Sequence, residues 1–270
     1  MTPTVLLTDF GLRDAYVGMM KGVIAGIAPE ALVIDLSHQV APQNVREATF
    51  SLFVSYRYFP SGTVFCCVVD PGVGSARRVV ALKIRAGSAG PYTLVGPDNG
   101  IFTGALFDTE ILKAVSIENP KYQLSEVSHT FHGRDIFAPV AAHLAAGVAL
   151  EELGPKLEPH TLHRLDWTAP REKERGWEVD TLHADHFGNL ITNLPAHYLK
   201  PDVDKWQVKV DRFDIGPVRR TFADVRVGHP LAYVGSSGFL ELAIRDGHAR
   251  EQLSLKEDSV ITVMPVKNGS

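Results

Sequence analysis

The chain has 270 residues, of which 45% are hydrophobic, and a formal net charge of −4 at pH 7. A chain of this length can bury a sizeable core in one large or two modest domains. The acidic balance and the lack of a long basic run argue against a nucleic-acid partner. No apolar stretch approaches the ~20 residues of a membrane span. No leader precedes the first strand, so we expect a cytoplasmic protein.

Strands and helices are predicted to alternate through the first part of the chain. Apolar runs rich in β-branched residues predict strands at residues 5–7, 31–36, 62–69, 79–84 and 92–95. Apolar residues at helical spacing predict helices over 16–27, 44–58 and 136–147. Asp14 and Asp135 are candidate caps for the first and third of these helices. This alternation predicts an α/β domain with a mainly parallel sheet covered by helices.

The second part of the chain has a different character. Residues 155–177 collect proline, histidine and charge, including the run 171–175, and predict a linker. Beyond it, short runs bounded by turns predict strands at 178–184, 208–210, 231–234, 240–243 and 259–263. We therefore expect an N-terminal α/β domain over residues 1–154 and a smaller, mostly-β C-terminal domain over residues 178–270.

The two cysteines, Cys66 and Cys67, are adjacent in a predicted strand. Neighbouring side chains of a strand face opposite sides, so the two thiols cannot easily share a ligand or bridge each other. We expect buried, reduced thiols and no cysteine-based zinc site.

One acidic residue stands at the end of a predicted buried strand. The apolar run before Asp70 is followed by the turn Pro71-Gly72, which brings Asp70 to the rim where open α/β sheets bind ligands. Arg77, seven positions further on, can reach back to this carboxylate. Asp70 is therefore a candidate catalytic group, and the alternative is a turn acid beside a solvated arginine.

Two more polar clusters belong to the first domain. Asp9 and Asp14 flank a glycine turn after the first strand, where carboxylates can accept bonds from ribose hydroxyls or pair with a cationic ligand. The alternative is a turn acid and a helix cap. His132 precedes an apolar helix, where it can orient or relay a proton, or simply be a structural histidine.

The second domain carries two polar turns. His183, Asp185 and His186 resemble part of a zinc-hydrolase ligand set, but the accompanying His-x-His is missing. Asn189 can instead read an adenine edge, because its amide both donates and accepts. The glycine-flanked Ser236 lies in a turn that can bind a carboxylate or be a plain hairpin. It does not form Gly-x-Ser-x-Gly, which argues against a serine nucleophile.

Seven motifs in order resemble the S-adenosylmethionine (SAM) hydroxide adenosyltransferase family, relatives of the fluorinase and chlorinase enzymes. They are Thr8-Asp9-Phe10-Gly11, Pro42-Gln43-Asn44-Val45-Arg46, Asp70-Pro71-Gly72-Val73-Gly74, Gly96-Pro97-Asp98-Asn99-Gly100, Phe131-His132-Gly133-Arg134-Asp135, Phe187-Gly188-Asn189 and Ser236-Ser237-Gly238. The halogenases carry tyrosine in place of Asp70, and the fluorinase carries serine in place of Gly133. Both departures argue against halide as the nucleophile.

The resemblance implies hydrolysis of SAM to adenosine and methionine, with Asp70, Arg77 and His132 positioning a water for attack on the ribose C5′. It also implies that Asp9 holds the ribose hydroxyls and that Asn189 holds the adenine. The remaining implied contacts are Asp14, Asp185 and Ser236 at the methionine end and the backbone from Ala243 to Arg245 beside the adenine.

The resemblance implies no cofactor and no metal. It implies a homotrimer, with the substrate between the first domain of one subunit and the second domain of its neighbour. The alternatives to hydrolysis are a SAM-dependent halogenase that uses chloride and a non-catalytic protein that binds SAM or a nucleoside.

Overall fold

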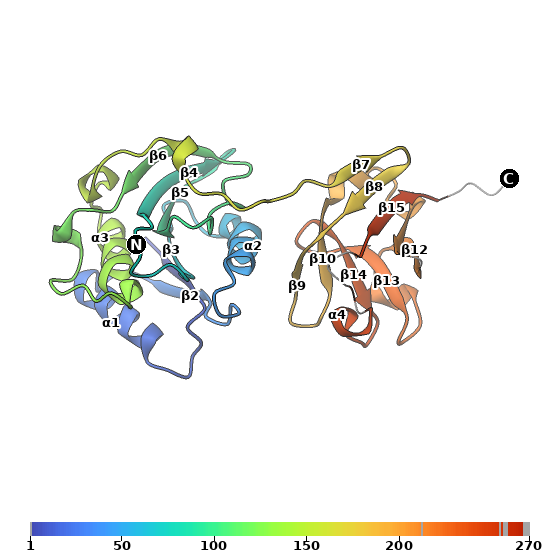
Figure 1. Cartoon of the computed structure of the whole chain (residues 1–270), viewed down its shortest axis with the longest axis horizontal. Coiled ribbons are helices and arrows are strands. Elements are labelled where there is room, and N and C mark those ends of the chain that lie inside the picture. The colour runs from blue at the N-terminus through green and yellow to red at the C-terminus, as the bar shows by residue number, and fades with distance from the viewer. Residues whose placement is uncertain (1, 212, 254, 256–258, 267–270) are drawn as a thin grey trace. The chain divides into compact units, whose positions relative to one another are not determined.

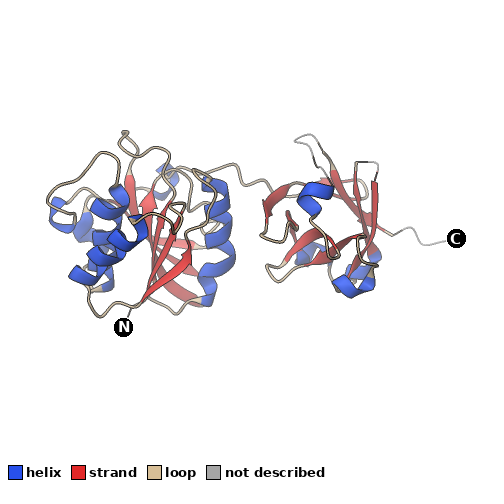
Figure 2. Cartoon of the chain, turned by 90° about the horizontal axis from the view of Figure 1, so that it is seen from below, coloured by secondary structure: helices blue, strands red, loops and turns tan. Residues whose placement is uncertain are grey.

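The computed structural model describes residues 2–211, 213–253, 255 and 259–266. The chain divides into two compact units, Met1–Trp167 and Thr168–Ser270, which we call the N-terminal unit and the C-terminal unit. The first combines helices with a sheet and the second consists mostly of strands, as Figures 1 and 2 show. In the part of the chain that is described, no helix is long and apolar enough to span a bilayer.

The N-terminal unit is built on a six-stranded sheet. Its order is β2 (Val33–Ser37), β1 (Thr4–Thr8), β3 (Val64–Val68), β5 (Ala89–Pro97), β4 (Val79–Ala86) and β6 (Glu110–Ser116). The first four strands run parallel, and β4 is antiparallel to both of its neighbours. This confirms the predicted α/β class and the mainly parallel sheet, whereas β6 was not predicted.

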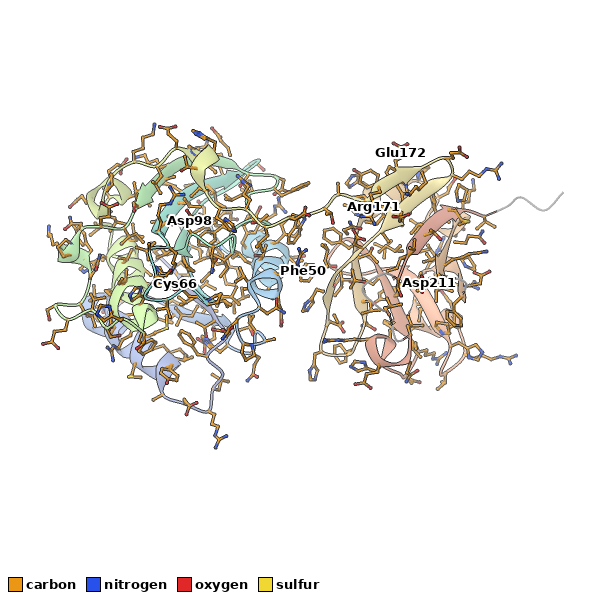
Figure 3. The ribbon with its side chains drawn as sticks, viewed as in Figure 1. Phe50, Cys66, Asp98, Arg171, Glu172 and Asp211 are labelled. Atoms are coloured by element: carbon orange, nitrogen blue, oxygen red, sulfur yellow. The ribbon has the colours of Figure 1, made fainter. Side chains whose placement is uncertain are left out.

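Helices cover both faces of this sheet (Figure 2). α1 (Tyr16–Ile27) and α3 (Ala138–Ala145) pack in one core, and α2 (Val45–Ser55) packs in the other. Consecutive residues of β3 alternate between the cores, so Cys66 faces α1 and α3 while Cys67 faces α2. Both cysteines are fully buried and free, as predicted, and Figure 3 labels Cys66 inside this unit.

Two of the predicted helix caps are wrong. α1 follows Ala15 with no side-chain cap, so Asp14 is not its cap. The chain enters α3 through a single π-helical turn, Gly133–Phe137, and Asp135 is fully buried inside this turn instead of capping the helix. Among the α-helices described in this unit, α2 alone has a side-chain cap, because Asn44 accepts a bond from the backbone N–H of Glu47.

The C-terminal unit forms a nine-stranded sheet, which confirms a mostly-β second half. Its order is β7 (Arg171–Lys173), β8 (Gly176–Val179), β15 (Ile261–Pro265), β11 (Trp206–Val210), β12 (Phe213–Arg219), β13 (Pro230–Val234), β14 (Phe239–Ile244), β10 (Leu190–Pro195) and β9 (Thr181–Ala184). Only β12 and β13 pair in parallel among these described strands, and the short helix α4 (Ala249–Gln252) packs beside β14.

The strand predicted over residues 178–184 is in fact two strands, β8 and β9, at separate places in the sheet. Asp180 lies between them and binds Arg171 through both carboxylate oxygens, at 2.7 and 2.8 Å. Arg171, labelled in Figure 3, belongs to β7, which lies within the stretch expected as a linker. A charged edge strand has no apolar alternation, so its sequence resembles a solvated linker.

Candidate active site

A pocket of about 390 Å³ opens at the carboxyl ends of β1 and β3 in the N-terminal unit. It brings together three predicted site residues, Asp9 after β1, Asp70 after β3 and His132 before the π-helical turn. The other residues that line it are Phe10, Tyr16, Pro42, Gln43, Val68, Pro71, Val73, Thr130, Phe131 and Gly133. The strand-end position predicted for Asp70 is therefore confirmed.

Asp70, Arg77 and His132 form one connected chain of contacts. Arg77 grips the Asp70 carboxylate with two donors, Nε at 2.8 Å from Oδ1 and Nη2 against Oδ2. The same Nη2 lies 2.8 Å from Nδ1 of His132. The side chains of Asp70 and Arg77 are only 5% and 10% exposed, so solvent screens this ion pair little. Asp70 is thus not a solvated turn acid but a clamped carboxylate at the pocket wall.

The contact with Arg77 decides which nitrogen of His132 carries the proton. A guanidinium has only donors, so Nδ1 must accept and the neutral imidazole carries its proton on Nε2. Burial lowers the pKa of His132 and the charge of Arg77 lowers it further, and these effects outweigh the attraction of Asp70 and Asp135. At neutral pH, His132 therefore offers an N–H donor at Nε2.

Neighbouring loops hold this chain in place. The side-chain amide of Asn99 donates to the backbone carbonyl of Val69 at 2.8 Å and so fixes the end of the strand that carries Asp70. Gly74 has φ of +77°, and a Cβ there would lie 2.5 Å from the carbonyl oxygen of His129. Only glycine allows this close approach between the loop of Asp70 and the loop of His132.

Asp9 is oriented by a backbone donor that sequence reasoning did not identify. Its Oδ2 accepts a bond of 2.7 Å from the N–H of Gln43, a residue with φ of +65°. A backbone N–H has no side-chain signature, so the motif around Gln43 showed no such role. Asp14, in contrast, is exposed and does not line the pocket.

Three aromatic rings form one side of the pocket. Phe10, Tyr16 and Phe131 contact one another with centroids 5.1 to 5.9 Å apart. A Cβ at Gly133 would lie 3.1 Å from the Phe10 ring, so a side chain there would press on this cluster. The spacing of such rings is typical of core residues, and for that reason the sequence did not mark them as site residues.

In the C-terminal unit, Asp185 and Asn189 close one turn between β9 and β10. Oδ1 of Asp185 accepts the N–H of Phe187 at 2.9 Å and that of Asn189 at 2.8 Å, and its Oδ2 accepts the Asn189 side-chain amide at 2.9 Å. Across the described residues, no group of three His, Cys, Asp or Glu side chains is arranged to hold a metal. The structure therefore does not assemble the ligand set considered for His183, Asp185 and His186.

Ser236 is exposed in the turn between β13 and β14. Beneath this turn, the buried Glu241 accepts bonds from the Tyr233 hydroxyl at 2.5 Å and from Ser237 Oγ at 3.0 Å. Burial raises the pKa of Tyr233, and the charges of Glu241 and Asp185 raise it further.

The last two predicted residues are on and after β14. Ala243 is fully buried, so neither its side chain nor its backbone is exposed within this chain. Arg245 donates from Nη1 to the carbonyl of Val225 at 2.8 Å.

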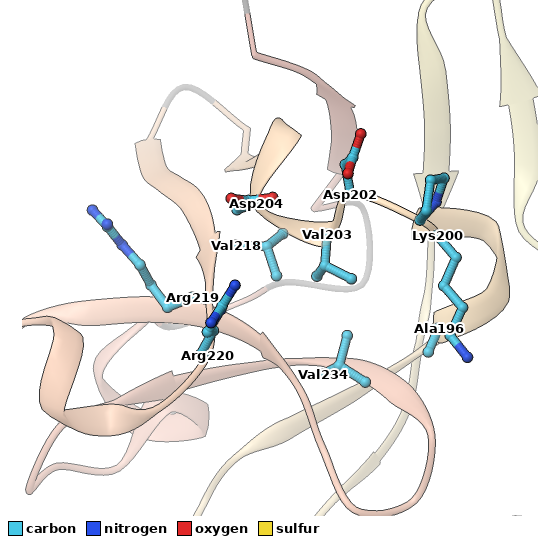
Figure 4. Close-up of a pocket in the computed structure, with 10 residues that line it drawn as sticks. Ala196, Lys200, Asp202, Val203, Asp204, Val218, Arg219, Arg220 and Val234 are labelled. Carbon is cyan, nitrogen blue, oxygen red and sulfur yellow. The ribbon is translucent and has the colours of Figure 1, made fainter.

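A second pocket in the C-terminal unit, of about 450 Å³, contains none of the predicted site residues (Figure 4). Its sides carry Val203, Val218 and Val234, with Lys200 and Arg219 among the charged residues around them. Asp202 and Asp204 also line it, but none of the described histidines does. The chemistry expected of an active site is found in the smaller pocket around Asp70.

Comparison with known proteins shows the family of the chain. The family models of the SAM hydroxide adenosyltransferase N-terminal and C-terminal domains match residues 4–154 and 179–262. The chain is 44% identical over 274 residues to the (R)-S-adenosyl-L-methionine hydrolase of Thermus thermophilus, covering 99% of both. It is 40% identical to the enzyme of that name from Salinispora tropica, over 94% of this chain and 96% of the relative. A fluorinase from Actinoplanes is 31% identical over 95% of each.

Solved structures show the same fold. A conserved uncharacterized protein from Thermotoga maritima superimposes with a TM-score of 0.87 at 38% identity, over 97% of this chain and 99% of the other. A conserved hypothetical protein from Thermus thermophilus gives 0.81 at 42% identity, over 98% and 100%. With both family models matched and near full-length relatives at such identity, the chain belongs to the SAM hydroxide adenosyltransferase family.

Proposed function

We propose that this protein hydrolyses (R)-S-adenosyl-L-methionine to adenosine and L-methionine. The relatives with this activity in their names support the substrate and its sulfonium configuration. The observation that carries the proposal is the clamped Asp70 beside a neutral His132 at the wall of one pocket. An acceptor and a donor so placed can hold one water in a fixed orientation.

The difficult part of the reaction is the nucleophile, since a sulfonium already leaves readily. Free water has a pKa of about 15.7 and is a weak nucleophile. Each oxygen of Asp70 keeps a lone pair beyond its bond to Arg77, so it can accept one water hydrogen. The Nε2 hydrogen of His132 donates to the water oxygen, which leaves an oxygen lone pair for the ribose C5′.

In the proposed step, the bond from the water oxygen to C5′ forms as the bond from C5′ to sulfur breaks. The electron pair of the breaking bond stays on sulfur as the methionine thioether, and the water proton passes through Asp70 to solvent. Positioning of this kind can supply up to ~7–11 kcal/mol of the barrier, and proton transfer about another 10²–10⁴-fold. A carboxylate held by arginine is a weak base, so orientation is its larger contribution.

The substrate contacts are part of the same proposal. Asp9 holds the ribose hydroxyls, and the amide of Asn189 holds the adenine, bordered by the backbone from Ala243 to Arg245. Asp14, Asp185 and Ser236 bind the methionine end. The self-contained turn of Asp185 and the exposure of Ser236 support a binding role for these groups.

The test is incubation of the purified, chelator-treated protein with each sulfonium diastereomer in ¹⁸O-labelled water, with chloride present and absent. We expect adenosine that carries ¹⁸O on the 5′ carbon, methionine, and faster turnover of the (R) isomer. A 5′-chloro nucleoside would establish halide transfer instead. Binding without product would establish a SAM or nucleoside sensor, and turnover that stoichiometric metal restores would establish a metallohydrolase.

The homotrimer and the cytoplasmic location stay predictions. Sedimentation of the purified protein tests the first, and a single species of three times the chain mass is expected.

A further inference from the structure

A buried histidine behind the Asp9 loop has no part in the proposed reaction. The side chain of His38 is 1% exposed and lies just after β2. Its Nδ1 is 2.8 Å from Thr8 Oγ1, and its Nε2 is 3.0 Å from Asp35 Oδ1. Asp35 also accepts a bond of 2.7 Å from Lys21. Of these four groups only Thr8 and His38 are buried, whereas the side chains of Lys21 and Asp35 are 40% and 38% exposed. Buried polar groups are costly unless they are hydrogen-bonded, so the contact between Thr8 and His38 matters most.

The direction of the hydrogen bonds in this chain follows from its chemistry. Nε2 of His38 lies beside the carboxylate of Asp35, but the two groups are not aligned as a hydrogen bond. No other described group forms a hydrogen bond with this nitrogen. Burial alone would raise the pKa of Asp35, but the contacts with Lys21 and His38 leave this pKa below its usual value. Nε2 therefore carries the proton, and Nδ1 accepts from the Thr8 hydroxyl.

That donation fixes the hydroxyl of Thr8. With its hydrogen directed at His38, Oγ1 has its lone pairs free for the N–H of Phe10, which lies at 3.2 Å. On the other side of Asp9, the N–H of Gly11 donates to the carbonyl of His38 at 2.8 Å. The backbone on both sides of Asp9 is thus held from His38, while its carboxylate is held by the N–H of Gln43.

We infer that Thr8 and His38 are positioning residues for the Asp9 carboxylate and so determine how tightly the ribose hydroxyls are bound. This inference rests on the proposed function, in which Asp9 binds the ribose. Small displacements of an oriented group cost much of its effect, so a loosened loop should weaken the bonds to the two hydroxyls specifically.

The experiment compares the affinities of adenosine and 2′,3′-dideoxyadenosine by calorimetry. Thr8→Val keeps the shape of the side chain and removes the hydroxyl. Thr4→Val is the matched control, because Thr4 is also fully buried on β1 and its hydroxyl has no hydrogen-bond partner among the described residues. We expect Thr8→Val to bind adenosine about tenfold more weakly, the equivalent of one lost hydrogen bond, with the affinity for the dideoxy analogue unchanged.

Kinetics supply the second readout. Thr8→Val should raise the KM for the substrate while kcat stays within about twofold, because Asp70 and His132 are not moved. Thr8→Ser should restore the wild-type ratio of the affinity for adenosine to the affinity for 2′,3′-dideoxyadenosine. Thr4→Val should not change this ratio. Should Thr8→Val fail to fold, His38→Met, which removes the acceptor and fills its space, is judged by the same ratio.

The outcomes separate the inference from the proposed function. If the wild-type protein does not prefer adenosine over the dideoxy analogue, the ribose role of Asp9 fails. If the wild type discriminates and Thr8→Val discriminates equally well, the positioning role is overturned. Equal weakening of both ligands also overturns it, because that pattern indicates a general structural role.

Discussion

Two carboxylates among the predicted site residues, Asp70 in the N-terminal unit and Asp185 in the C-terminal unit, are held in different ways. Asp70 is gripped by the side chain of Arg77, which in turn contacts His132, 55 positions further along the chain. Asp185 is held by donors within four positions of itself, two backbone N–H groups and the amide of Asn189. The first arrangement joins the Asp70 carboxylate, the Arg77 guanidinium and the titratable imidazole of His132. The second is a preformed turn with no titratable donor on its carboxylate.

On the proposed function, this difference separates a group that takes part in the reaction from groups that bind the substrate. A group that takes part in the reaction needs partners that set its charge and orientation, whereas a recognition turn needs only a fixed shape. Substitutions at the Asp70 chain should therefore lower kcat, and substitutions at the Asp185 turn should raise KM. Four predictions test this contrast, and a fifth concerns the buried cysteines.

The largest effect is expected from Asp70→Asn. The amide has one acceptor oxygen in place of two and cannot take the water proton, so kcat should fall by about 10²–10⁴-fold with little change in KM. Asp98→Asn is the matched control, because Asp98 is also paired with a neighbouring arginine, Arg78, and is 6% exposed, but does not line the pocket. Steady-state kinetics of both variants decide the matter, and a near-normal kcat for Asp70→Asn would remove Asp70 from the chemistry.

A smaller loss is expected from Arg77→Lys. Lysine keeps the charge but cannot bind both oxygens of Asp70 and Nδ1 of His132 together, so we expect kcat to fall on the order of 10²-fold. Arg78→Lys, which alters the equivalent pair with Asp98, should leave kcat of the folded enzyme unchanged. Equal kcat values for the two variants would contradict the special role of Arg77.

The pH profile should reveal His132. Its pKa is lowered by burial and by Arg77, so the active, neutral form persists at neutral pH, and kcat/KM should fall only below the ordinary pKa of about 6.5. The unfolded chain binds the His132 proton more tightly than the folded chain does. The contribution of His132 to folding stability is therefore fully present above pH ~6.5 and is lost as the pH falls toward the lower pKa of His132 in the folded state. His132→Asn should remove both dependences, and an unchanged acid limb in this variant would exclude His132.

A moderate effect is expected from Asn189→Ala in the C-terminal unit. Loss of one uncharged hydrogen bond to the adenine should raise KM by about three- to tenfold while kcat is retained. Asn193→Ala is the control. Asn193 lies on β10, the strand that follows this turn, and its side chain bonds to protein groups at Asp180 and Thr168. A fall in kcat for Asn189→Ala would show that the turn affects the chemical step.

The smallest effect is expected at the cysteines. Burial raises the pKa of the Cys66 thiol to about 12, and that of Cys67 is raised as well, so neither forms a reactive thiolate at neutral pH. Thiol reagents should neither modify the native protein nor change its rate. Rapid modification under native conditions would show that the sheet opens.

Much of the fold was predictable because its strands are buried on both faces. The nearly continuous apolar runs of β1 and β3 are typical of strands that are buried on both faces of a parallel sheet. β12 was not predicted, since Gly216 and Pro217 in its middle are typical of a turn. β10 was missed because its central Thr192 and Asn193 are polar, yet tertiary bonds to Leu240 and Asp180 allow both to be buried.

The candidate site was predictable where it is local. Asp70 and Arg77 are seven positions apart around one turn, so their pairing depends mainly on nearby backbone geometry. The sequence placed Asp9 and His132 at the ends of secondary-structure elements, but it did not predict which groups their side chains contact. The cap assigned to Asp14 was wrong although α1 begins at Tyr16 as predicted, because Ala15 occupies the cap position. The cap assigned to Asp135 was wrong because the π-helical turn before α3 has no distinctive sequence pattern.

The two-part α/β and β character, the family and the polar residues at the strand ends follow from the order of the amino acids alone. The orientation of those residues depends on how the chain folds. The tautomer of His132 depends on Arg77, and the position of Asp9 depends on the backbone of Gln43 and on both the ring and the carbonyl of His38. These contacts join residues far apart in the chain, and several use backbone donors that every residue but proline has. A hydrogen bond needs its atoms within about 3 Å, and only folding brings them that close.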